Sequence, residues 1–249
     1  MNITTSSTLA LIVASTLCAQ QANAAIALDR TRVIMNAGEK SVSLNISNQN
    51  KSLPYLAQGW IEDAAGNKIS APLAVLPPVQ RVEPGAKSQV KVQSSPAMNS
   101  LPQDRETLFY FNLREIPPRS TKPNTLQIAL QTRIKLFYRP AGIALDKTQA
   151  ANGDWIEKIT LTRQEGKYTL NNPTPYFLTL VEARTSANAE PVKFEPTMVA
   201  PKSNGELHVP ENALGNSPVF NYVNDYGGRP QIQFRCDGAT CTAALLKEK

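Results

Sequence analysis

The stretch TLQIALQTRIKLFYRP, residues 125–140, carries the pattern that decides the fold class of this chain. Apolar side chains occupy every second position from Leu126 through Ile128 to Leu130 and return four residues later. This period-two alternation is typical of a β-strand with one apolar face. We therefore predict a strand along the alternating residues 126–134. A long apolar strand at a sheet edge invites another chain to pair with it, so the stretch could complete the core of this protein or that of another.

Strand-like segments also dominate the rest of the first half of the chain. They are SVSLNISN (residues 41–48), YLAQGWIED (55–63), SQVKVQ (88–93) and LFYFNLREI (108–116). The 19 prolines and 12 glycines punctuate the chain, and no segment shows the 3.6-residue period of an amphipathic helix. The sequence predicts an all-β protein in which about seven short strands over roughly 115 residues form an immunoglobulin-like sandwich.

A break in the alternation divides the chain into two parts. Pro140-Ala141-Gly142 interrupts the pattern, and strand-like sequence resumes with WIEKITLTRQ at residues 155–164. A chain of 249 residues has room for two domains of about 100 residues or more. We predict an N-terminal domain over residues 25–143 and a C-terminal domain over residues 144–249.

The first residues have the character of an export signal. The apolar segment at residues 8–19 is too short to cross a bilayer, and Ala22-Asn23-Ala24 fits a small-residue cleavage site. We predict a signal peptide over residues 1–24, although the segment lacks the Lys or Arg that usually precedes the apolar part. A lipoprotein leader is the weaker alternative, because Leu17 occupies the position before Cys18, where a small residue is expected.

Charge and cysteine content restrict the partners and cofactors. The net charge is +6, and in an exported protein this favours an acidic partner, a carboxylate or an anionic surface, over nucleic acid. After the predicted cleavage Cys236 and Cys241 remain, with the turn-forming pair Asp237-Gly238 between them. We predict that they form a disulfide that closes a C-terminal hairpin. Together with the single histidine, His208, they are too few ligands for a structural zinc site, and we expect no metal or cofactor.

Six segments of the chain resemble, in the same order, the periplasmic pilus-assembly chaperones. They are LPYLAQGWIED, PPVQRVEPGAKS, LPQDRETLFYFNLREIPPRS, LQIALQTRIKLFYRP, NPTPYF and NDYGGRP. The resemblance implies two immunoglobulin-like sandwich domains set in a boomerang. It also implies a location in the periplasm and folding assistance that uses neither ATP nor a cofactor.

The resemblance implies a use for the opening stretch. Pilus subunits of this system are immunoglobulin-like folds that lack their last strand, and the chaperone completes them with its own edge strand, named G1. Here G1 matches residues 125–136, and Leu126, Ile128 and Leu130 match the side chains that enter the subunit groove. Burial of each would contribute about 1.5–3 kcal/mol. The alternative is that these side chains fill the core of this protein.

The family also holds the C-terminal carboxylate of the subunit between two cations, and these match Arg32 and Lys135. Such charge-assisted hydrogen bonds are short and strong, on the order of 4 kcal/mol each at an effective dielectric constant of about 20. Lys135 lies five residues beyond Leu130, roughly 17 Å along an extended strand. Strict alternation would put these two side chains on opposite faces, unless a twist or bulge intervenes. Each cation could instead be a solvated surface charge.

A third set of residues matches a charged network between the two domains of the family. Its members here are Glu106, Arg139 and Asp225. The resemblance implies that this network fixes the angle of the cleft and therefore the spacing of the two anchor cations. Ion pairs of this kind are better indicators of orientation than of stability. The alternative is three independent surface charges.

Further positions match the surface that docks on the outer-membrane usher. They are Leu56, Gln58, Pro77 and Pro78. The loop EIPPRSTKPN, residues 115–124, is short, which in this family indicates rod-like, adhesive pili. The implied partners are pilus subunits, both pilins and a tip adhesin, and the usher. An exposed apolar edge would also allow the free chaperone to pair with itself as a dimer.

Two other classes of function compete with this interpretation. An enzyme is disfavoured because the chain has one histidine and no G-x-S-x-G motif, and its neighbouring acids Glu62 and Asp63 would point apart on a strand. The other class is a cell-surface sandwich module, such as an adhesin or a pilin, and a pilin would have one domain preceded by a donor strand. Strand-like sequence instead begins near Ala25, and two domains are expected.

Overall fold

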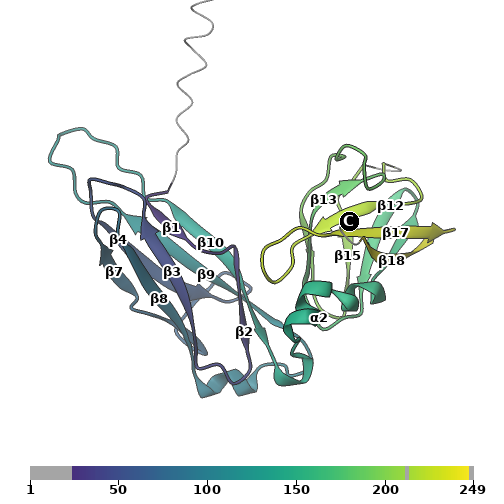
Figure 1. Cartoon of the computed structure of the whole chain (residues 1–249), viewed down its shortest axis with the longest axis horizontal. Coiled ribbons are helices and arrows are strands. Elements are labelled where there is room, and N and C mark those ends of the chain that lie inside the picture. Colours follow the sequence, from purple (N-terminus) through teal and green to yellow (C-terminus); the bar gives the residue numbers. More distant parts are fainter. Residues whose placement is uncertain (1–23, 211–212, 247–249) are drawn as a thin grey trace, which may run out of the picture.

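The structure is a computed structural model that describes residues 24–210 and 213–246. Figure 1 shows two β-rich lobes that meet at an angle, which is the predicted boomerang. The predicted signal peptide lies outside the described residues except for Ala24. Among the residues that the structure describes, no helix has the length and apolar character needed to cross a membrane.

The first lobe is a sandwich of two sheets. One sheet has the order β1-β3-β8-β6, with strands at Ile26–Leu28, Ser41–Asn48, Lys87–Ser94 and Leu73–Leu76. The other has the order β2-β10-β9-β4-β5, with strands at Arg32–Asn36, Gln131–Arg139, Thr107–Ile116, Tyr55–Glu62 and Lys68–Ile69. Strand β7 (Val79–Val82) pairs with β4, and the 3-10 helix η2 (Pro96–Ser100) follows β8. The chain therefore changes sheets between β1 and β2.

Alternation along these strands builds the core of the first lobe. Successive side chains of a strand point to opposite faces, and one face of each sheet meets the other sheet. Leu44 and Ile46 of β3 pack against side chains such as Phe111 of β9 and Leu136 of β10, all of them almost completely buried. The predicted all-β sandwich is confirmed in this lobe.

The opening stretch is a strand over only part of its predicted length. Strand β10 begins at Gln131, whereas residues 125–130 belong to no strand. The ladder with β9 begins at the pair Gln131 and Arg114, and beyond it only the carbonyl of Leu130 accepts a hydrogen bond from the N–H of Glu115, at 3.0 Å. The predicted start at residue 126 is therefore wrong for the isolated chain. The apolar side chains extend past the end of the core, where no described strand pairs with them.

The second lobe follows one path of eight strands, β14-β13-β16-β17-β18-β11-β12-β15. In that order they are Thr197–Val199, Leu178–Arg184, Val219–Tyr222, Gln231–Asp237, Thr240–Leu246, Thr160–Gln164, Lys167–Asn172 and Ser203–Leu207. Strands β14 and β15, at the two ends of the path, are consecutive in the chain and in contact. The sheet therefore folds back on itself around a second core that contains Tyr168, Phe220 and Phe234.

Three short helices connect the lobes: η3 (Ala141–Ile143), α2 (Lys147–Asn152) and η4 (Asp154–Lys158). The carboxylate of Asp146 caps α2 by accepting from the N–H of Gln149 at 2.8 Å, and Gly153, at a φ of 64°, ends the helix. A helix of six residues is too short to show an amphipathic period, so the sequence did not predict it. The domain boundary between residues 143 and 144 stays a prediction.

The C-terminal hairpin is formed by β17 and β18. Cys236 and Cys241 are register partners in this hairpin and are joined by a disulfide. Gly238, with a φ of 60°, lies in the turn between them, where a left-handed conformation favours glycine. The predicted disulfide and hairpin are confirmed.

Candidate functional site

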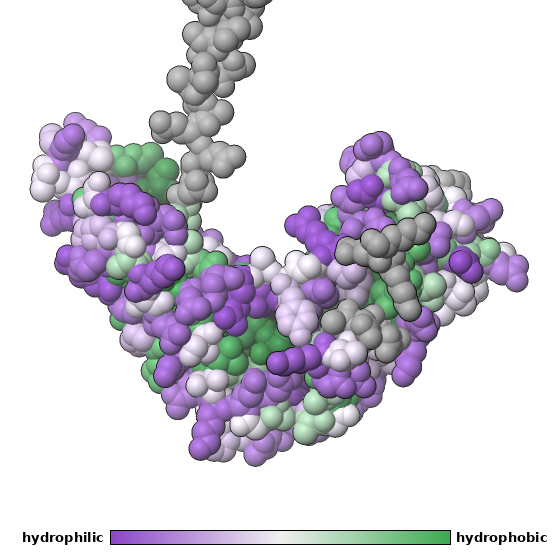
Figure 2. All heavy atoms as spheres, viewed as in Figure 1, coloured by the Kyte–Doolittle hydropathy of each residue, from purple (hydrophilic) through white to green (hydrophobic). Residues whose placement is uncertain are grey.

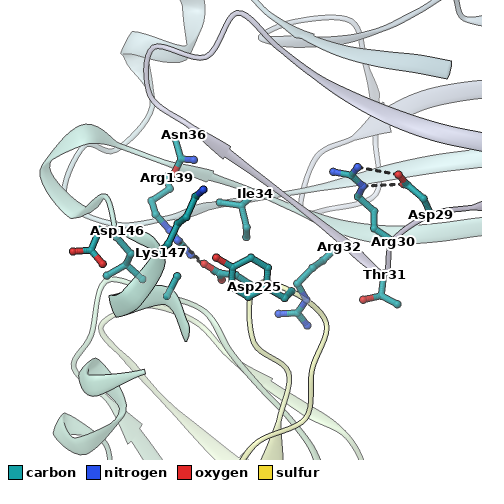
Figure 3. Close-up of a pocket in the computed structure, with 13 residues that line it drawn as sticks. Asp29, Arg30, Thr31, Arg32, Ile34, Asn36, Arg139, Asp146, Lys147 and Asp225 are labelled. Carbon is teal, nitrogen blue, oxygen red and sulfur yellow. Dashed lines mark hydrogen bonds and ion pairs between the residues drawn. The ribbon is translucent and has the colours of Figure 1, made fainter. Parts of the chain in front are cut away.

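A cleft of about 420 Å³ lies between the lobes. Figure 2 shows the molecule hollowed at this place, and Figure 3 shows the side chains that line the cleft. Arg32 and Arg139 reach it from β2 and β10 of the first lobe, and Asp225 reaches it from a loop of the second. The cleft thus contains members of both charged sets that the resemblance implied.

Strands β2 and β10 bring the two expected anchor residues together. The strands run parallel, and Arg32 is the register partner of Lys135. Nη1 of Arg32 donates to the carbonyl of Val223 at 2.8 Å, and Nζ of Lys135 donates to Oγ1 of Thr179 at 3.1 Å. Both cations therefore reach from the first lobe to the second, and Arg32 also lines the cleft whereas Lys135 does not.

The two cations are half-buried and lack a balancing carboxylate. Among the described residues, no Asp or Glu forms an ion pair with either of them. Burial, and then the charge of Arg32, lowers the pKa of Lys135 to about 8. Burial also lowers the pKa of Arg32, against the opposing charges of Asp225 and Glu106. Because the site disfavours two adjacent cations, it gains from an anion and suits a carboxylate.

Strand β10 alternates strictly between its two faces. Its core side chains are Ile134, Leu136 and Tyr138, and the side chains between them are Arg133, Lys135, Phe137 and Arg139. The ladder with β9 continues without a register shift from Gln131 to Tyr138. No bulge intervenes there, so Lys135 lies on the outer face of the sheet. Leu130 has the parity of the core residues and belongs to the other face.

The three expected donor side chains are exposed. Leu126 is 84% exposed, Ile128 64% and Leu130 40%. None of them belongs to the core of the first lobe. The alternative in which they fill the core of this protein is therefore wrong, and their role toward another chain stays a prediction.

Arg139 holds a buried ion network that joins the lobes. Its Nε and Nη2 donate to Oε1 of Glu106 at 2.9 and 2.7 Å, and its Nη1 and Nη2 donate to the carboxylate of Asp225 at 2.7 and 3.1 Å. The side chains of Arg139 and Glu106 are 4% and 2% exposed. Burial acts to lower the pKa of Arg139, but the hydrogen bonds and charges of the two carboxylates outweigh it and raise the pKa. The alternative of three independent surface charges is wrong.

The loop NPTPYF, residues 172–177, provides contacts between the lobes that the sequence did not assign. The N–H of Glu106 donates to the carbonyl of Pro175 at 2.9 Å, and the N–H of Phe177 donates to Oε2 of Glu106 at 2.8 Å. The rings of Phe177 and Phe137 lie 5.3 Å apart across the boundary. This loop was one of the segments that resemble the family, but the sequence similarity did not indicate which residues the loop contacts.

The side chain of Asn172 holds the same loop in shape. Its Nδ2 donates to the carbonyls of Tyr176 and Ala200 at 2.8 and 3.0 Å, and its Oδ1 accepts from the N–H of Thr174 at 3.1 Å. The hydroxyl of Tyr176 donates to the carbonyl of Ile143 in the connection between the lobes at 2.8 Å. Asn172 is completely buried, so these bonds are made without competition from solvent.

The expected usher-facing residues lie together on the first lobe. Leu56 and Gln58 of β4 are register partners of Arg81 and Val79 of β7. The N–H of Gly59 donates to the carbonyl of Pro78 at 2.9 Å, which brings the two exposed prolines Pro77 and Pro78 to this edge. Exposed apolar side chains in and around these strands are Leu53, Leu56, Leu76 and Val79. The sequence had named only Leu56 among these four.

The described residues contain no group of three or more His, Cys, Asp or Glu placed to hold a metal ion. His208 is exposed directly after β15. Glu62 accepts from the indole N–H of Trp60 at 3.0 Å, whereas Asp63 accepts from the N–H of Asn67 at 2.8 Å. The two neighbouring carboxylates therefore accept from different partners.

The site and fold agree with two family models that match the chain. The model for the N-terminal domain of PapD, described as a pili and flagellar-assembly chaperone, matches residues 25–144. The model for the C-terminal domain of the pili assembly chaperone PapD matches residues 154–234. The chain belongs to this family of pilus-assembly chaperones.

Individual relatives support the same assignment. The chaperone protein PapD of Escherichia coli is 51% identical over 230 residues, which cover 92% of both chains. The probable fimbrial chaperone YfcS of Escherichia coli is 50% identical over 235 residues, covering 94% of this chain and 91% of the relative. The crystal structure of the periplasmic chaperone SfaE is 32% identical, with a TM-score of 0.66, and the match covers 84% of this chain and 98% of SfaE. The predicted family and fold class are confirmed.

Proposed function

We propose that this protein is a periplasmic chaperone that binds pilus subunits and completes their fold with its own strand. One observation supports the proposal above the others. Three exposed aliphatic side chains, from Leu126 to Leu130, lead directly into a core strand that carries the half-buried cation Lys135. The exposed apolar residues and one of the two proposed anchor cations therefore lie on one continuous segment.

The exposed segment at residues 125–130 is suited to donate a strand. A subunit that lacks its last strand has an apolar groove and unpaired backbone groups. Residues 125–130 can extend β10 into that groove, because Leu126, Ile128 and Leu130 have the same parity as the core residues of β10. Main-chain hydrogen bonds would supply affinity that tolerates different subunit sequences, and each buried aliphatic side chain would add about 1.5–3 kcal/mol.

Arg32 and Lys135 are suited to hold the C-terminal carboxylate of the subunit. Their register pairing places two cations side by side, with no ionic partner among the described residues. A carboxylate bound between them would relieve the cost of burying both charges and would form charge-assisted hydrogen bonds. The network around Arg139 would keep the lobes in position and thereby preserve this pair of contacts.

The proposal includes the partners that the family implies. The clients would be pilins and a tip adhesin, with the short loop at residues 115–124 in favour of an adhesive pilus. The patch around Leu56, Gln58, Pro77 and Pro78 would dock on the outer-membrane usher, supported by its exposed apolar side chains. We further propose that the protein is not an enzyme, that its domains divide at residues 143 and 144, and that its free form pairs through residues 125–130.

The function is tested by co-expression in the periplasm with the fimbrial subunits encoded beside the gene, followed by co-purification. We expect the wild-type protein to recover one or more subunits and the Lys135→Ala variant to recover few or none. The Lys167→Ala variant, which removes an exposed lysine of the second lobe, is the matched control and should behave as the wild type. Equal recovery by wild type and Lys135→Ala would refute the carboxylate anchor, and no recovery by the wild type would refute the function.

A further inference from the structure

The outer face of the larger sheet in the first lobe carries an ordered array of cations and aromatic rings. Cross-strand register arranges it in three rows. The first row is Arg32, Lys135, Tyr110, Glu62 and Lys68, the second is Arg133, Asn112 and Trp60, and the third is Gln131, Arg114 and Gln58. Their sequence neighbours in β4, β9 and β10 form the core, so these side chains belong to the face that points away from it.

Arg133 is held at the centre of this face. Its guanidinium centre lies 3.4 Å from the ring centre of Tyr110, and its Nε donates to Oε2 of Glu62 at 2.8 Å. The ring fixes the plane of the guanidinium, and the carboxylate fixes its direction. The side chain of Arg133 is still 41% exposed, whereas that of Glu62 is only 14% exposed. The cation is therefore presented outward, and the carboxylate that supports it is largely covered.

Trp60 organises the cations on the other side of the face. The guanidinium centre of Arg114 and the Nζ of Lys68 each lie 5.6 Å from a ring centre of Trp60. Nη2 of Arg114 also donates to Oε1 of Gln58 at 2.6 Å. We call the six residues that carry these contacts the outer-face platform. They are Trp60, Glu62, Lys68, Tyr110, Arg114 and Arg133.

The outer-face platform has three cations, Lys68, Arg114 and Arg133, against one carboxylate, and Arg32 and Lys135 extend its first row. The three rows contain five cations and one carboxylate, Glu62. That carboxylate already accepts from both Trp60 and Arg133. Aromatic rings hold most of the cations in place, and rings do not neutralise them as carboxylates would. The charge of this face is thus available to a partner.

The platform lies between the two contact points of the proposed function. Lys135 and Arg133 are on the same face of β10 and two residues apart, about 7 Å along a strand. Arg133 lies on the side of Lys135 that leads to residues 125–130. Strand β2 pairs with β10 only from Lys135 onward, so the edge of β10 beside Arg133 has no described neighbour on that side. A subunit that reaches both the anchor and residues 125–130 must therefore pass Arg133.

We propose that the outer-face platform is a second contact surface for the pilus subunit, and that the subunit presents acidic side chains to it. This inference rests on the proposed function, because the anchor and the donor strand are what bring the subunit to this face. Cations that are already fixed in position lose little conformational entropy on binding. Complementary charge at an interface acts mainly on the association rate and on partner choice. The platform thus favours the approach of an acidic subunit before the donor strand is inserted.

The test measures how fast a subunit associates and how that rate depends on salt. The probe is the fimbrial subunit that co-purifies with the wild-type protein, unfolded in urea and diluted into excess chaperone in a stopped-flow instrument. The double variant Arg133→Gln with Arg114→Gln removes two platform cations. The double variant Arg163→Gln with Lys167→Gln removes two cations from β11 and β12 of the second lobe and serves as the charge-matched control. Far-UV circular dichroism checks that each variant is folded.

We expect the wild-type rate to fall about tenfold between low and high salt, as steering by opposite charges does. The platform variant should associate about tenfold more slowly at low salt and show a weaker salt dependence, whereas the control should follow the wild type. A second pair, Arg133→Lys with Arg114→Lys, should retain the salt dependence because it retains the charge. Equal rates for the platform variant and the control would overturn the inference, and so would equal losses in the Gln and Lys pairs.

The same preparations separate this inference from the function on which it rests. If Lys135→Ala and Ile128→Glu bind the subunit as well as the wild type does, the proposed function fails. If those two variants lose binding while the platform variant keeps the wild-type rate and salt dependence, the function stands and the outer-face platform is a solvated surface.

Discussion

Ile128 and Ile134 share the parity of one continuous segment, yet Ile134 is 8% exposed and Ile128 is 64% exposed. The difference lies in what faces each side chain. Ile134 packs in the core of the first lobe, whereas Ile128 lies beyond the beginning of β10. Two isoleucines only six residues apart therefore have different roles: Ile134 belongs to the core of this protein, and Ile128 would be inserted into the groove of a bound subunit.

This contrast gives a matched pair of variants. We expect Ile134→Ala to lower the free energy of unfolding by about 2–5 kcal/mol, because it leaves a cavity in the core. Ile128→Ala should change it by less than about 0.5 kcal/mol, as exposed positions usually do. Urea denaturation of both variants measures the two values. Only Ile128→Ala should combine wild-type stability with reduced subunit recovery, and a similar loss of stability in both variants would contradict the assignment.

The lowered pKa of Lys135 predicts that subunit binding depends on pH. An anchored carboxylate favours the charged lysine, so binding should be accompanied by proton uptake. Affinity should be highest below pH 8 and should fall as the pH rises through about 8, the pKa of Lys135 in the free protein. Titrations between pH 6.5 and about 9.5 measure this trend. The Lys135→Arg variant, whose cation does not titrate in this range, should lose the dependence.

The lowered pKa of Lys135 also predicts how the free energy of unfolding of the unbound protein changes with pH. Folding lowers the pKa of Lys135 from 10.5 to about 8, so the unfolded chain binds more protons between these two values. The cost of burying the charged lysine is present below the folded pKa and is relieved as the pH rises toward 10.5. The free energy of unfolding attributable to Lys135 should therefore increase over this window. Lys135→Met should remove the increase, and a wild-type slope in that variant would contradict the burial effect.

Substitutions in the buried ion network of Glu106, Arg139 and Asp225 should lower the free energy of unfolding by different amounts. Arg139→Ala would leave the carboxylate of Glu106 buried without its cation, and we expect a loss of about 3–5 kcal/mol in urea denaturation. Asp225→Asn should cost less, about 1–2 kcal/mol, because its side chain is 22% exposed and can be hydrated. The double variant Arg139→Met with Glu106→Gln should recover much of the loss. Equal losses for Arg139→Ala and Asp225→Asn would show that burial does not set the ranking.

Asn172 is expected to matter more than its neighbour Asn171. Asn172→Ala removes a buried side chain that bonds to several backbone groups of the loop at residues 172–177. We expect a loss of about 2–3 kcal/mol and a melting temperature lower by about 4–12 °C. Asn171, which makes one side-chain hydrogen bond to Thr160, serves as the control and should shift the melting temperature by less than about 3 °C on substitution by alanine. A larger effect at Asn171 would contradict the role given to Asn172.

The fold was predictable because its signals are local. Period-two alternation in segments such as residues 41–48 directly indicates strands, and the turn at Gly238 between two cysteines indicates a closed hairpin. The start of β10 was not predictable in the same way. A strand needs a neighbour, and the apolar pattern of residues 125–130 does not reveal that the ladder between β9 and β10 stops at the pair Gln131 and Arg114.

The site depended on relationships that no local pattern contains. Arg32 and Lys135 are about a hundred positions apart in the sequence, and only the parallel register of β2 and β10 makes them neighbours. Their roles came from resemblance to a family and not from spacing. The contacts of the loop at residues 172–177 and the rows of the outer-face platform were missed for the same reason, since both follow from register and from the packing of the lobes.

Strand β10 alternates without a register shift from Tyr138 past Lys135 to Gln131, and Leu130 directly precedes it, so Lys135 lies a set number of residues from the segment 125–130. If the C-terminal carboxylate of a subunit is bound at Lys135, the number of residues that precede the carboxylate decides which subunit residue lies beside residues 125–130. The ladder of β10, which has no register shift, fixes this spacing on the side of the chaperone. One additional residue at the end of a subunit would turn every side chain of its last strand to the wrong face, whereas two would restore the faces and displace the strand by about 7 Å. Subunits would therefore be sorted by the parity of their final segment before any individual side chain is recognised.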